Sequence, residues 1–518
     1  MLRTRLFLLP LALCLISPLQ SFAATTFYID ATQGSDTSTG TTPEQAWSSL
    51  AKVNDHKFTP GDQILFHAGQ SWTGTLTPHG SGATGSPITV SSYGDGAKPL
   101  LKGEGAGETI MLNEISYWTL RGLAVTNHGK TVGIRNGIMI HVSAAGVASG
   151  ISLIDVAVSD VNGEVGSKSS GGIGIMAWGK NGKPAHFDGL LIDHCTVEHV
   201  DGQGIWFHIK HDGGSSDPDD DIETKQLNTN VRITGTTILD TGRNAIFLRS
   251  TEAGSIDHNI IRFASARTHG NAICIVGSKD TIIRENEVSF TGVHQGGGEN
   301  GAFDADDGAQ GTIIEYNWSH DNNGGMANIV NDPRKHAENS GTIVRYNLSE
   351  NDKARIVSFG GAVQNSMVYN NTIFVGKGIS QHLLEAGRFV SHVPGNPEGI
   401  SFFNNVIYNQ GSLDYDINAT RVAFDANCFF GKHPSGGAKD AHIAIADFAF
   451  DKAAMPIADS IPDSIKDRKG IAIYRIPPSS TCAAPGLAIA NNGGRDILGA
   501  VLSGESLTAR GAVAPLPK

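Results

Sequence analysis

The chain has 518 residues and a net charge of −12, which argues against a general nucleic-acid-binding role because phosphate binding needs a basic face. It contains 64 glycines, and only 17% of its residues are charged, which fits many tight turns between short strands. The length is large for one ordinary domain, but repeat folds escape that limit because each unit buries its apolar surface on its neighbours.

The first 23 residues have the pattern of a signal peptide. Arg3 and Arg5 supply the charged region, residues 6–16 the apolar run, and residues 21–23 a small-x-small cleavage site. The apolar run is too short for a membrane span, and no later run reaches about 18 apolar residues. We therefore expect a soluble protein without a membrane span that is secreted or periplasmic.

Four cysteines follow the signal peptide. An oxidising compartment permits a disulfide between Cys428 and Cys482. Cys195 and Cys274 are expected to be buried small apolar side chains. The cysteines and histidines show no spacing typical of a zinc site.

One amphipathic helix is predicted near the start of the chain. Thr42 is placed as its N-cap and Pro43 at the first helical position. Trp47, Leu50 and Val53 follow at a spacing of three and face one side. Such a helix would cover the open end of a stack of repeats.

Short β-like segments that end in an asparagine before an apolar residue recur along the chain. Their asparagines are spaced 24 to 34 residues apart: Asn259, Asn286, Asn317, Asn347, Asn371 and Asn405. Periods of this length with two or three short strands each indicate a solenoid, and no sustained helical period is present. We predict that these asparagines form a structural amide ladder at a turn between coils.

The N-terminal region resembles the caps of a known group, the secreted right-handed parallel β-helix proteins of the pectate-lyase-like superfamily. The resemblance rests on residues 28–30, 34–36 and 60–62 and on Pro43 with Trp47, and it extends over most of residues 26–430. It implies an all-β, right-handed parallel β-helix with an N-terminal capping helix and an irregular C-terminal cap. It is less informative about the reaction, because the superfamily hosts lyases, hydrolases, epimerases and binding proteins.

Four parts are expected along the chain: a signal peptide (1–23), an N-terminal cap with the first coils (24–110), the parallel β-helix (111–430) and a C-terminal cap or edge-covering segment (431–518). Within the last part, residues 443–454 have a helix-like pattern. The longest interruption of the coils, residues 208–230, is polar and contains a run of aspartates. It is expected to be a solvated loop, or else a loop that walls a cleft or holds Ca²⁺.

Alignment of the second short strand of successive coils predicts a functional surface. Alternation of side chains places a set of aromatic, cationic and acidic residues on the outward face, and stacked coils lie about 4.8 Å apart. This set comprises Trp206, His208, Phe247, Arg249, Asp304, Asp306 and Asn328. An exposed strip of this kind suits a sugar polymer, since rings stack on sugar faces and carboxylates transfer protons or bind cations.

Asp304 and Asp306 lie two residues apart, so one strand face carries both. In a lyase, Asp304, Asp306 and Asp307 would hold Ca²⁺, which neutralises a substrate carboxylate and acidifies the proton alpha to it. A base then removes that proton. In a hydrolase, one carboxyl group protonates the leaving oxygen and the other activates water or attacks carbon. A third, structural interpretation has these aspartates cap backbone N–H groups in a turn.

The sequence therefore predicts a secreted monomer that cleaves an acidic, uronate-containing polysaccharide by β-elimination, with Ca²⁺ as a possible cofactor. Its expected catalytic residues are Asp304, Asp306, Arg249 and His208. Lys353 and Arg355 are further candidates for the base or the charge neutraliser. The expected substrate-binding residues are Trp206, Phe247, Asn328 and Arg355. The first alternative is a glycoside hydrolase that uses the same aspartate pair, and the second is a non-catalytic glycan-binding or surface structural protein.

Overall fold

A computed structural model describes residues 23–144, 146–211, 222, 226–292, 299–387, 393–434, 439–446, 471 and 473–514. Residues 1–22 of the expected signal peptide and the aspartate-rich part of the 208–230 loop lie outside these ranges. Among the described residues, no helix has both the length and the apolar character needed to cross a membrane.

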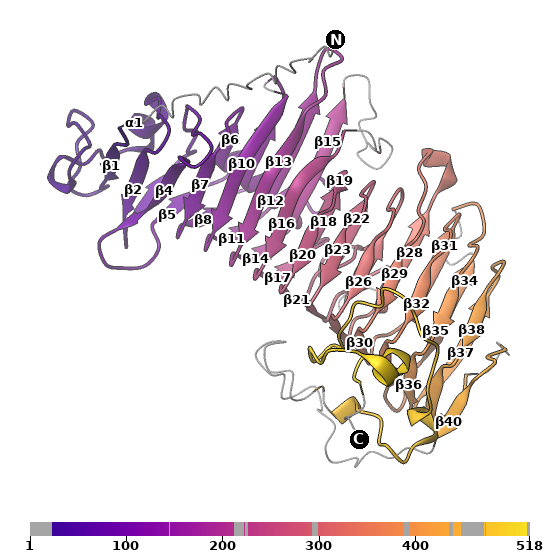
Figure 1. The fold of residues 1–518 in the computed structure, drawn as a ribbon. Helices are drawn as coiled ribbons and strands as arrows, with labels where there is room; N and C mark the ends of the chain where they lie inside the picture. The colour runs from indigo at the N-terminus through magenta and orange to yellow at the C-terminus, as the bar shows by residue number, and fades with distance from the viewer. Residues whose placement is uncertain are drawn as a thin grey trace, which may run out of the picture.

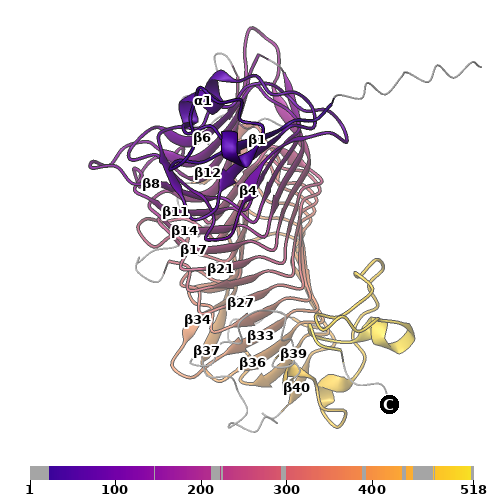
Figure 2. The same cartoon turned by 90° about the vertical axis from the view of Figure 1, so that its left-hand side faces the viewer.

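The described chain winds into a right-handed parallel β-helix, as the sequence predicts (Figure 1). Three sheets of 15, 14 and 11 strands run along the stack, and their strands pair in parallel throughout. One turn of the chain typically contributes one strand to each sheet, so that the coils lie like rungs along the axis (Figure 2). We refer to these as the first, second and third sheets.

The first sheet contains β1 (Thr26–Ile29), β2 (Gln63–His67), β4 (Ile88–Tyr93), β7 (Trp118–Arg121), β10 (Val147–Ile154), β13 (His186–Asp193), β16 (Asn228–Thr234), β19 (Thr251–Glu252), β20 (Ser255–Asp257), β23 (Ile282–Arg284), β26 (Ile313–Glu315), β29 (Ile343–Arg345), β32 (Met367–Tyr369), β35 (Ser401–Phe403) and β38 (Ala423–Asp425). The second contains β3 (Ser71–Thr73), β5 (Leu100–Lys102), β8 (Ala124–Asn127), β11 (Ala157–Val161), β14 (Thr196–Val200), β17 (Thr237–Thr241), β21 (Ile260–Arg262), β24 (Glu287–Ser289), β27 (Trp318–His320), β30 (Leu348–Glu350), β33 (Thr372–Val375), β36 (Val406–Asn409), β39 (Cys428–Gly431) and β40 (Ala444–Ala446). The third contains β6 (Glu108–Asn113), β9 (Asn136–Val142), β12 (Gly171–Gly179), β15 (Gln203–His211), β18 (Ile246–Arg249), β22 (Ile273–Val276), β25 (Phe303–Ala305), β28 (Ala327–Asn331), β31 (Arg355–Gly361), β34 (Ser380–Gly387) and β37 (Ser412–Ile417).

The core lies inside the coils and is filled by the apolar side chains that point inward from successive strands. In β25, Phe303 and Ala305 are fully buried in this core, whereas Asp304 between them points outward. β-Branched and aromatic residues dominate the inward positions because they pack well on a pleated surface. This alternation fixes which side chains reach the outer surface of the third sheet.

An asparagine ladder runs inside the stack between the first and second sheets. Asn317 shows the pattern: its Oδ1 accepts from the backbone N and the Nδ2 of Asn286, and its Nδ2 donates to Asn347 and to the carbonyl of Ile283, at 2.9–3.0 Å. All six predicted asparagines take part, and the ladder continues to Asn427. The predicted structural role of these residues is confirmed.

The N-terminal cap differs from the prediction at the start of its helix. A 3₁₀ turn covers η1 (Pro43–Gln45), and the α-helix α1 (Leu50–Asp55) begins only after Ser49, whose side chain caps Lys52 N. The break arises because the Asp36 carboxylate accepts hydrogen bonds from Ser49 and its neighbour, which hold that segment extended. The apolar residues expected to face the core are nevertheless buried: Trp47, Leu50 and Val53.

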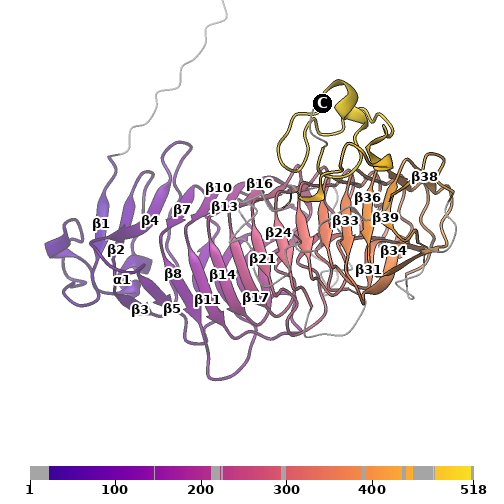
Figure 3. The ribbon, with the colours of Figure 1, turned by 90° about the horizontal axis from the view of Figure 1, so that it is seen from below.

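Residues 473–514 pack against the side of the last coils (Figure 3). The Arg345 guanidinium donates to the carbonyl of Asn491 at 2.7 Å, and a disulfide joins Cys428 of β39 to Cys482. This segment contains the short 3₁₀ turns η4 (Thr481–Ala483) and η5 (Gly504–Thr508), and η2 (Pro333–Lys335) lies in an earlier loop. The segment is therefore tied covalently and by hydrogen bonds to the coils that it covers.

The helix-like pattern expected over residues 443–454 is not realised where the structure describes it. Residues 444–446 form the strand β40, which pairs in parallel with β39 and extends the second sheet, and residues 447–454 lie outside the described ranges. The free edge of β39 offers backbone groups that a strand satisfies and an isolated helix does not.

We expect Asn317→Ala to lower the free energy of unfolding by about 3 kcal/mol, because four buried hydrogen-bonding groups each lose a bond to the Asn317 side chain. Thermal unfolding followed by circular dichroism measures the effect. Asn418→Ala is the matched control, since Asn418 is exposed and outside the ladder. Equal melting temperatures for the two variants would contradict a stabilising role for the ladder.

A second prediction concerns His320 of β27, which lies buried on the outward face of the second sheet. Its Nδ1 is 3.0 Å from Asp321 Oδ2, and its Nε2 is 3.7 Å from Glu287 Oε1. Burial alone would lower the pKa of His320, but these two carboxylates outweigh burial and raise it to about 9. The charged imidazolium thus stabilises the fold fully below its unfolded pKa of about 6.5, and this stabilisation is lost as the pH rises through about 9.

The melting temperature should therefore fall more steeply between pH 6.5 and 9.5, a window set by these pKa values, in the wild type than in His320→Gln. His79→Gln, at an exposed position, serves as the control. Parallel pH profiles for all three proteins would show that His320 does not carry this stabilisation.

Candidate functional site

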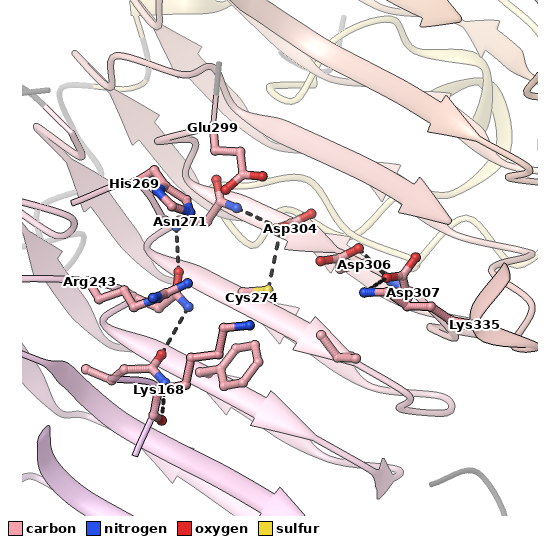
Figure 4. Close-up of a pocket in the computed structure, with 15 residues that line it drawn as sticks. Lys168, Arg243, His269, Asn271, Cys274, Glu299, Asp304, Asp306, Asp307 and Lys335 are labelled. Carbon is pink, nitrogen blue, oxygen red and sulfur yellow. Dashed lines mark hydrogen bonds and ion pairs between the residues drawn. The ribbon is translucent and has the colours of Figure 1, made fainter. Parts of the chain in front are cut away.

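A pocket opens on the outer face of the third sheet, around β18, β22 and β25 (Figure 4). Its cavity has a volume of about 120 Å³. Charged and amide side chains make up most of its lining, which comprises Lys168, Gln203, Arg243, Asn244, Phe247, His269, Gly270, Asn271, Cys274, Val276, Glu299, Asp304, Asp306, Asp307 and Lys335. The pocket includes both members of the predicted aspartate pair.

Strand register brings the predicted outward residues into one row. Trp206 of β15 pairs with Phe247 of β18, which pairs with Cys274 of β22, then Asp304 of β25 and Asn328 of β28. The sequence alignment of successive coils is therefore correct in register. Trp206 and Asn328 lie more than 100 positions apart in sequence but in one row, because each coil returns the chain to the same face.

The row was expected to be exposed to solvent, and this expectation is wrong for Trp206 and Phe247 at its N-terminal end. Trp206 is fully buried, its Nε1 donates to Asn136 Oδ1 at 3.0 Å, and its ring belongs to a small apolar cluster outside the main core. Phe247 belongs to the same cluster, although it also lines the pocket. Met176 and Ile222 pack against this cluster, so the Trp206 ring is not available as a sugar-stacking platform.

His208 and Arg249, expected to be catalytic, are also buried and do not line the pocket. The His208 ring packs on Trp206 and Phe247, with centroids 4.8 and 6.0 Å away. Burial, and then the nearby Arg249 charge, hold the pKa of His208 well below its usual range. A neutral, enclosed imidazole next to a buried guanidinium is a packing arrangement rather than an accessible base.

The two remaining substrate-binding candidates lie beyond the pocket. Asn328 is buried, donates to Asn271 Oδ1 at 3.3 Å and accepts from the Ser358 hydroxyl at 2.5 Å. Arg355 is buried and 3.7 Å from Glu385. Asn328 contacts the pocket through its hydrogen bond to Asn271, which lines it. Arg355 lies in β31, two strands from β25.

Asp304 occupies the centre of the site. It is 5% exposed, and its Oδ2 accepts from Asn271 Nδ2 at 2.7 Å and from Cys274 Sγ at 3.4 Å. Its Oδ1 is buried without a hydrogen-bond partner. One carboxyl oxygen is thus fixed by the protein, while the other is left for a proton or a ligand.

Asp306 follows β25 and lies half-buried beside Asp304. Its Oδ1 accepts from the backbone N of Asp307 at 2.7 Å. Asp307 itself is ion-paired with Lys335 at 2.8 Å and accepts from the backbone N of Asp332. Lys335 therefore compensates Asp307 directly and brings a positive charge to the side of Asp306 that faces away from Asp304.

The pair has strongly perturbed acidity. Burial, and then the charge of Glu299, raise the pKa of Asp304 well above its usual range. Burial, and then the charges of Asp307 and Asp304, raise the pKa of Asp306 in the same direction. Two enclosed carboxyl groups this close resist being ionised together, so the pair is built to retain a proton at neutral pH.

Several pocket residues were not predicted from the sequence. Asn271 and Cys274 hold Asp304 in place, Glu299 sets its acidity, and Arg243 lies at the far end of the pocket. One signal was available: the segment Asn-Ala-Ile occurs at residues 244–246 and again at 271–273, immediately before or at the start of successive third-sheet strands.

The residues present fit the expected Ca²⁺ poorly. The group whose ligand atoms lie within 4.8 Å of one another is Cys274, Asp304 and Asp306, whereas Asp307 is occupied by Lys335. Calcium takes six to eight oxygen ligands, and a thiol is not among those that it prefers. We derive no catalytic step through a metal at this site.

No family model matches the chain. The chain is 26% identical over 509 residues to the lacto-N-biosidase of Bifidobacterium longum subsp. longum, a match that covers 78% of this chain and 31% of that protein. The chain thus spans about a third of the length of this curated relative.

Similar solved structures include the GH136 lacto-N-biosidase of Eubacterium ramulus, at a TM-score of 0.62 and 19% identity, with 77% of this chain and 67% of that chain covered. A complex of XylC with xylose matches at a TM-score of 0.50 and 14% identity, with 95% of this chain and 99% of that chain covered. At these identities the structural likeness establishes the parallel β-helix fold.

The expectation of a lyase that acts by β-elimination is wrong. The curated relative that aligns with most of the chain is a glycoside hydrolase. The site agrees with this correction, because none of the expected bases, His208, Arg249, Lys353 and Arg355, lines the pocket. The aspartate pair, which belongs to the hydrolase alternative, does line it.

We expect Glu299→Gln to lower the pKa of Asp304, because the substitution removes a negative charge that disfavours its ionised form. Carbon-13 NMR of the aspartate carboxyl groups in the intact protein follows this titration. Glu104→Gln, at an exposed position in the first coils, is the control and should leave the pKa of Asp304 unchanged. An unchanged or raised pKa in Glu299→Gln would exclude the proposed electrostatic role of Glu299.

Proposed function

We propose that this chain is a glycoside hydrolase that cleaves a glycan in the pocket on the third sheet. The observation that carries the proposal is the buried Asp304 beside Asp306, two carboxyl groups with raised pKa values in one pocket. The 26% identity to a lacto-N-biosidase supports the same reaction class. A lacto-N-biose glycoside is therefore the first substrate to test.

In this proposal Asp304 is the general acid. Its Oδ2 is held by Asn271 and Cys274, so that a proton on the unpartnered Oδ1 can point to the glycosidic oxygen of a bound substrate. Its raised pKa keeps that proton bound at neutral pH, as a general acid requires. Transfer of the proton to the leaving oxygen leaves Asp304 as a carboxylate.

Asp306 is then the nucleophile. The backbone N–H of Asp307 and the nearby charge of Lys335 favour its ionised form. Its carboxylate attacks the anomeric carbon as the bond to the leaving oxygen breaks, which forms a glycosyl ester. Asp304 next takes a proton from water, the hydroxide displaces Asp306 from the anomeric carbon, and both carboxyl groups return to their starting states.

The separation of the pair favours retention of configuration. One carboxyl oxygen of Asp304 and one of Asp306 lie within 4.8 Å of each other. Inverting glycosidases hold their carboxyl groups about 6.5–9.5 Å apart to leave room for a water molecule, and retaining ones about 5–5.5 Å apart. This pair therefore has the spacing of a direct nucleophile rather than of a base that acts through water.

We also propose that the protein is exported and works as a monomer on a glycan outside the cytoplasm. The signal-peptide pattern of the first 23 residues supports export. The disulfide between Cys428 and Cys482 also supports it, since such bonds persist in oxidising compartments.

Asp304→Asn and Asp306→Asn should each lower kcat by about 10²–10⁴-fold on a natural glycan, because each removes a group that transfers a proton or forms a bond. Asp304→Asn should lose less on an aryl glycoside, whose leaving group needs little protonation, whereas Asp306→Asn should lose activity on both. Initial rates of sugar release measure the effect. Asp416→Asn is the matched control, since this exposed aspartate pairs in register with Glu385 on the same sheet.

The product distinguishes the reaction classes in the same assay. A hydrolase raises reducing ends without the absorbance of an unsaturated uronate, and the poor fit of the site to Ca²⁺ predicts that chelator leaves the rate unchanged. Wild-type rates in both Asp304→Asn and Asp306→Asn would place the chemistry elsewhere. Retention on a glycan column without any product would favour a binding protein.

A further inference from the structure

The pocket has acidic side chains toward one end and basic side chains toward the other. Four acidic residues lie toward one end: Glu299, Asp304, Asp306 and Asp307. Lys168 and Arg243 lie toward the opposite end, as Figure 4 shows. The third cation, Lys335, lies among the acidic residues and is paired with Asp307. The proposed reaction uses the acidic end and assigns no role to the cationic end.

Arg243 is the notable residue at the cationic end. It is half-buried, and its guanidinium makes no hydrogen bond or ion pair with any residue that the structure describes. A nearby arginine behaves differently, since Arg267 binds Asp201 at 2.8 Å and Asp240 at 3.0 Å. In a protein of net charge −12, an arginine without an acidic partner inside a pocket is a group that a ligand can satisfy.

The wall around Arg243 is fixed by amides that already bind one another. Asn244 Nδ2 donates to Gln203 Oε1 at 3.0 Å, and Gln203 Nε2 donates to the carbonyl of Lys168 at 2.9 Å. Asn244 Oδ1 accepts from the backbone N of Asn271 at 2.7 Å. These amides hold the strand ends in place but leave few of their own groups for a ligand, so recognition at this end falls to the guanidinium.

The cationic end and the reaction centre belong to the same pocket. Arg243 precedes β18, and Asp304 lies in β25, with β22 between them. Two coil spacings correspond to about 10 Å along the axis. A glycan whose cleaved bond lies at Asp304 and Asp306 therefore brings a nearby sugar of the same chain to Arg243.

We propose that Arg243, assisted by the charge of Lys168, forms an anion subsite that binds a carboxylate or sulfate substituent on a sugar near the cleaved bond. A guanidinium presents its N–H donors as a planar fork, which matches the paired oxygens of both groups. Glu299, at the acidic end, repels the same substituent and so sets the direction in which the glycan lies. The glycan part of this inference rests on the proposed hydrolase function, whereas anion binding at Arg243 does not.

Binding is tested first, with the full chain and simple probes. Sodium sulfate and sodium glucuronate are titrated at constant ionic strength and followed by NMR, against wild type and Arg243→Gln. Arg421→Gln is the control, because Arg421 is an exposed arginine that is paired with Glu398 in the last coils. We expect Arg243→Gln to weaken binding of at least one probe tenfold or more, with Arg421→Gln equal to wild type. The tighter probe identifies the substituent, and equal affinities in wild type and Arg243→Gln would overturn the subsite.

Kinetics on matched substrates supply the second test. Two aryl glycosides of the same sugar are compared, one neutral and one that carries the anionic group selected by the binding test. Arg243→Gln should raise KM for the acidic glycoside at least tenfold more than for the neutral one, and Arg243→Lys should recover part of the difference. Equal losses on both substrates would overturn the inference. An absence of hydrolysis by the wild type, together with anion binding that depends on Arg243, would reject the hydrolase and leave the subsite standing.

Discussion

Parallel stacking of the coils in register is the constraint on which the rest of this structure depends. Successive strands of one sheet lie about 4.8 Å apart, so residues 24 to 34 positions apart in sequence become direct neighbours. The asparagine ladder holds that register from inside, since each side-chain amide donates to the next amide and accepts from the backbone N–H of the preceding asparagine. A slip of one residue would turn every outward side chain inward.

The chemistry of the pocket follows from the same constraint. Register places Asp304 beside Cys274 of the preceding strand, and the turn before that strand supplies Asn271. Burial in this setting makes ionisation of a second carboxyl group unfavourable, so the pair retains a proton that an exposed pair would release. The fold thus provides both the position and the acidity that an acid and a nucleophile need.

Sequence reasoning succeeded where a local pattern decides the outcome. The parallel β-helix, the asparagine ladder and the outward row through Asp304 all follow from short repeated segments and strand alternation, and the structure confirms them. The disulfide between Cys428 and Cys482 is likewise present. The aspartate pair was recognised because it falls on the outward positions of an aligned strand.

Sequence reasoning failed where the burial of an outward-facing side chain depends on neighbouring residues that pack over it. Trp206, His208 and Arg249 have the outward alternation expected of a binding strip, but neighbouring side chains bury them, and alternation carries no information about such cover. The direction of a hydrogen bond, such as that from Asn271 to Asp304, depends on side-chain positions that coil spacing alone does not give. The choice of reaction was wrong for a related reason: the fold hosts several chemistries, and the residues of the site decide among them.

The most direct test of the central claim is the configuration of the first product. Proton NMR of the anomeric signals, recorded in the first minutes of hydrolysis before the released sugar mutarotates, shows which anomer forms first. Direct attack by Asp306, with Asp304 as acid and then base, predicts the same anomeric configuration as in the substrate. The opposite anomer would contradict the account, because a water molecule would then have attacked where Asp306 is placed.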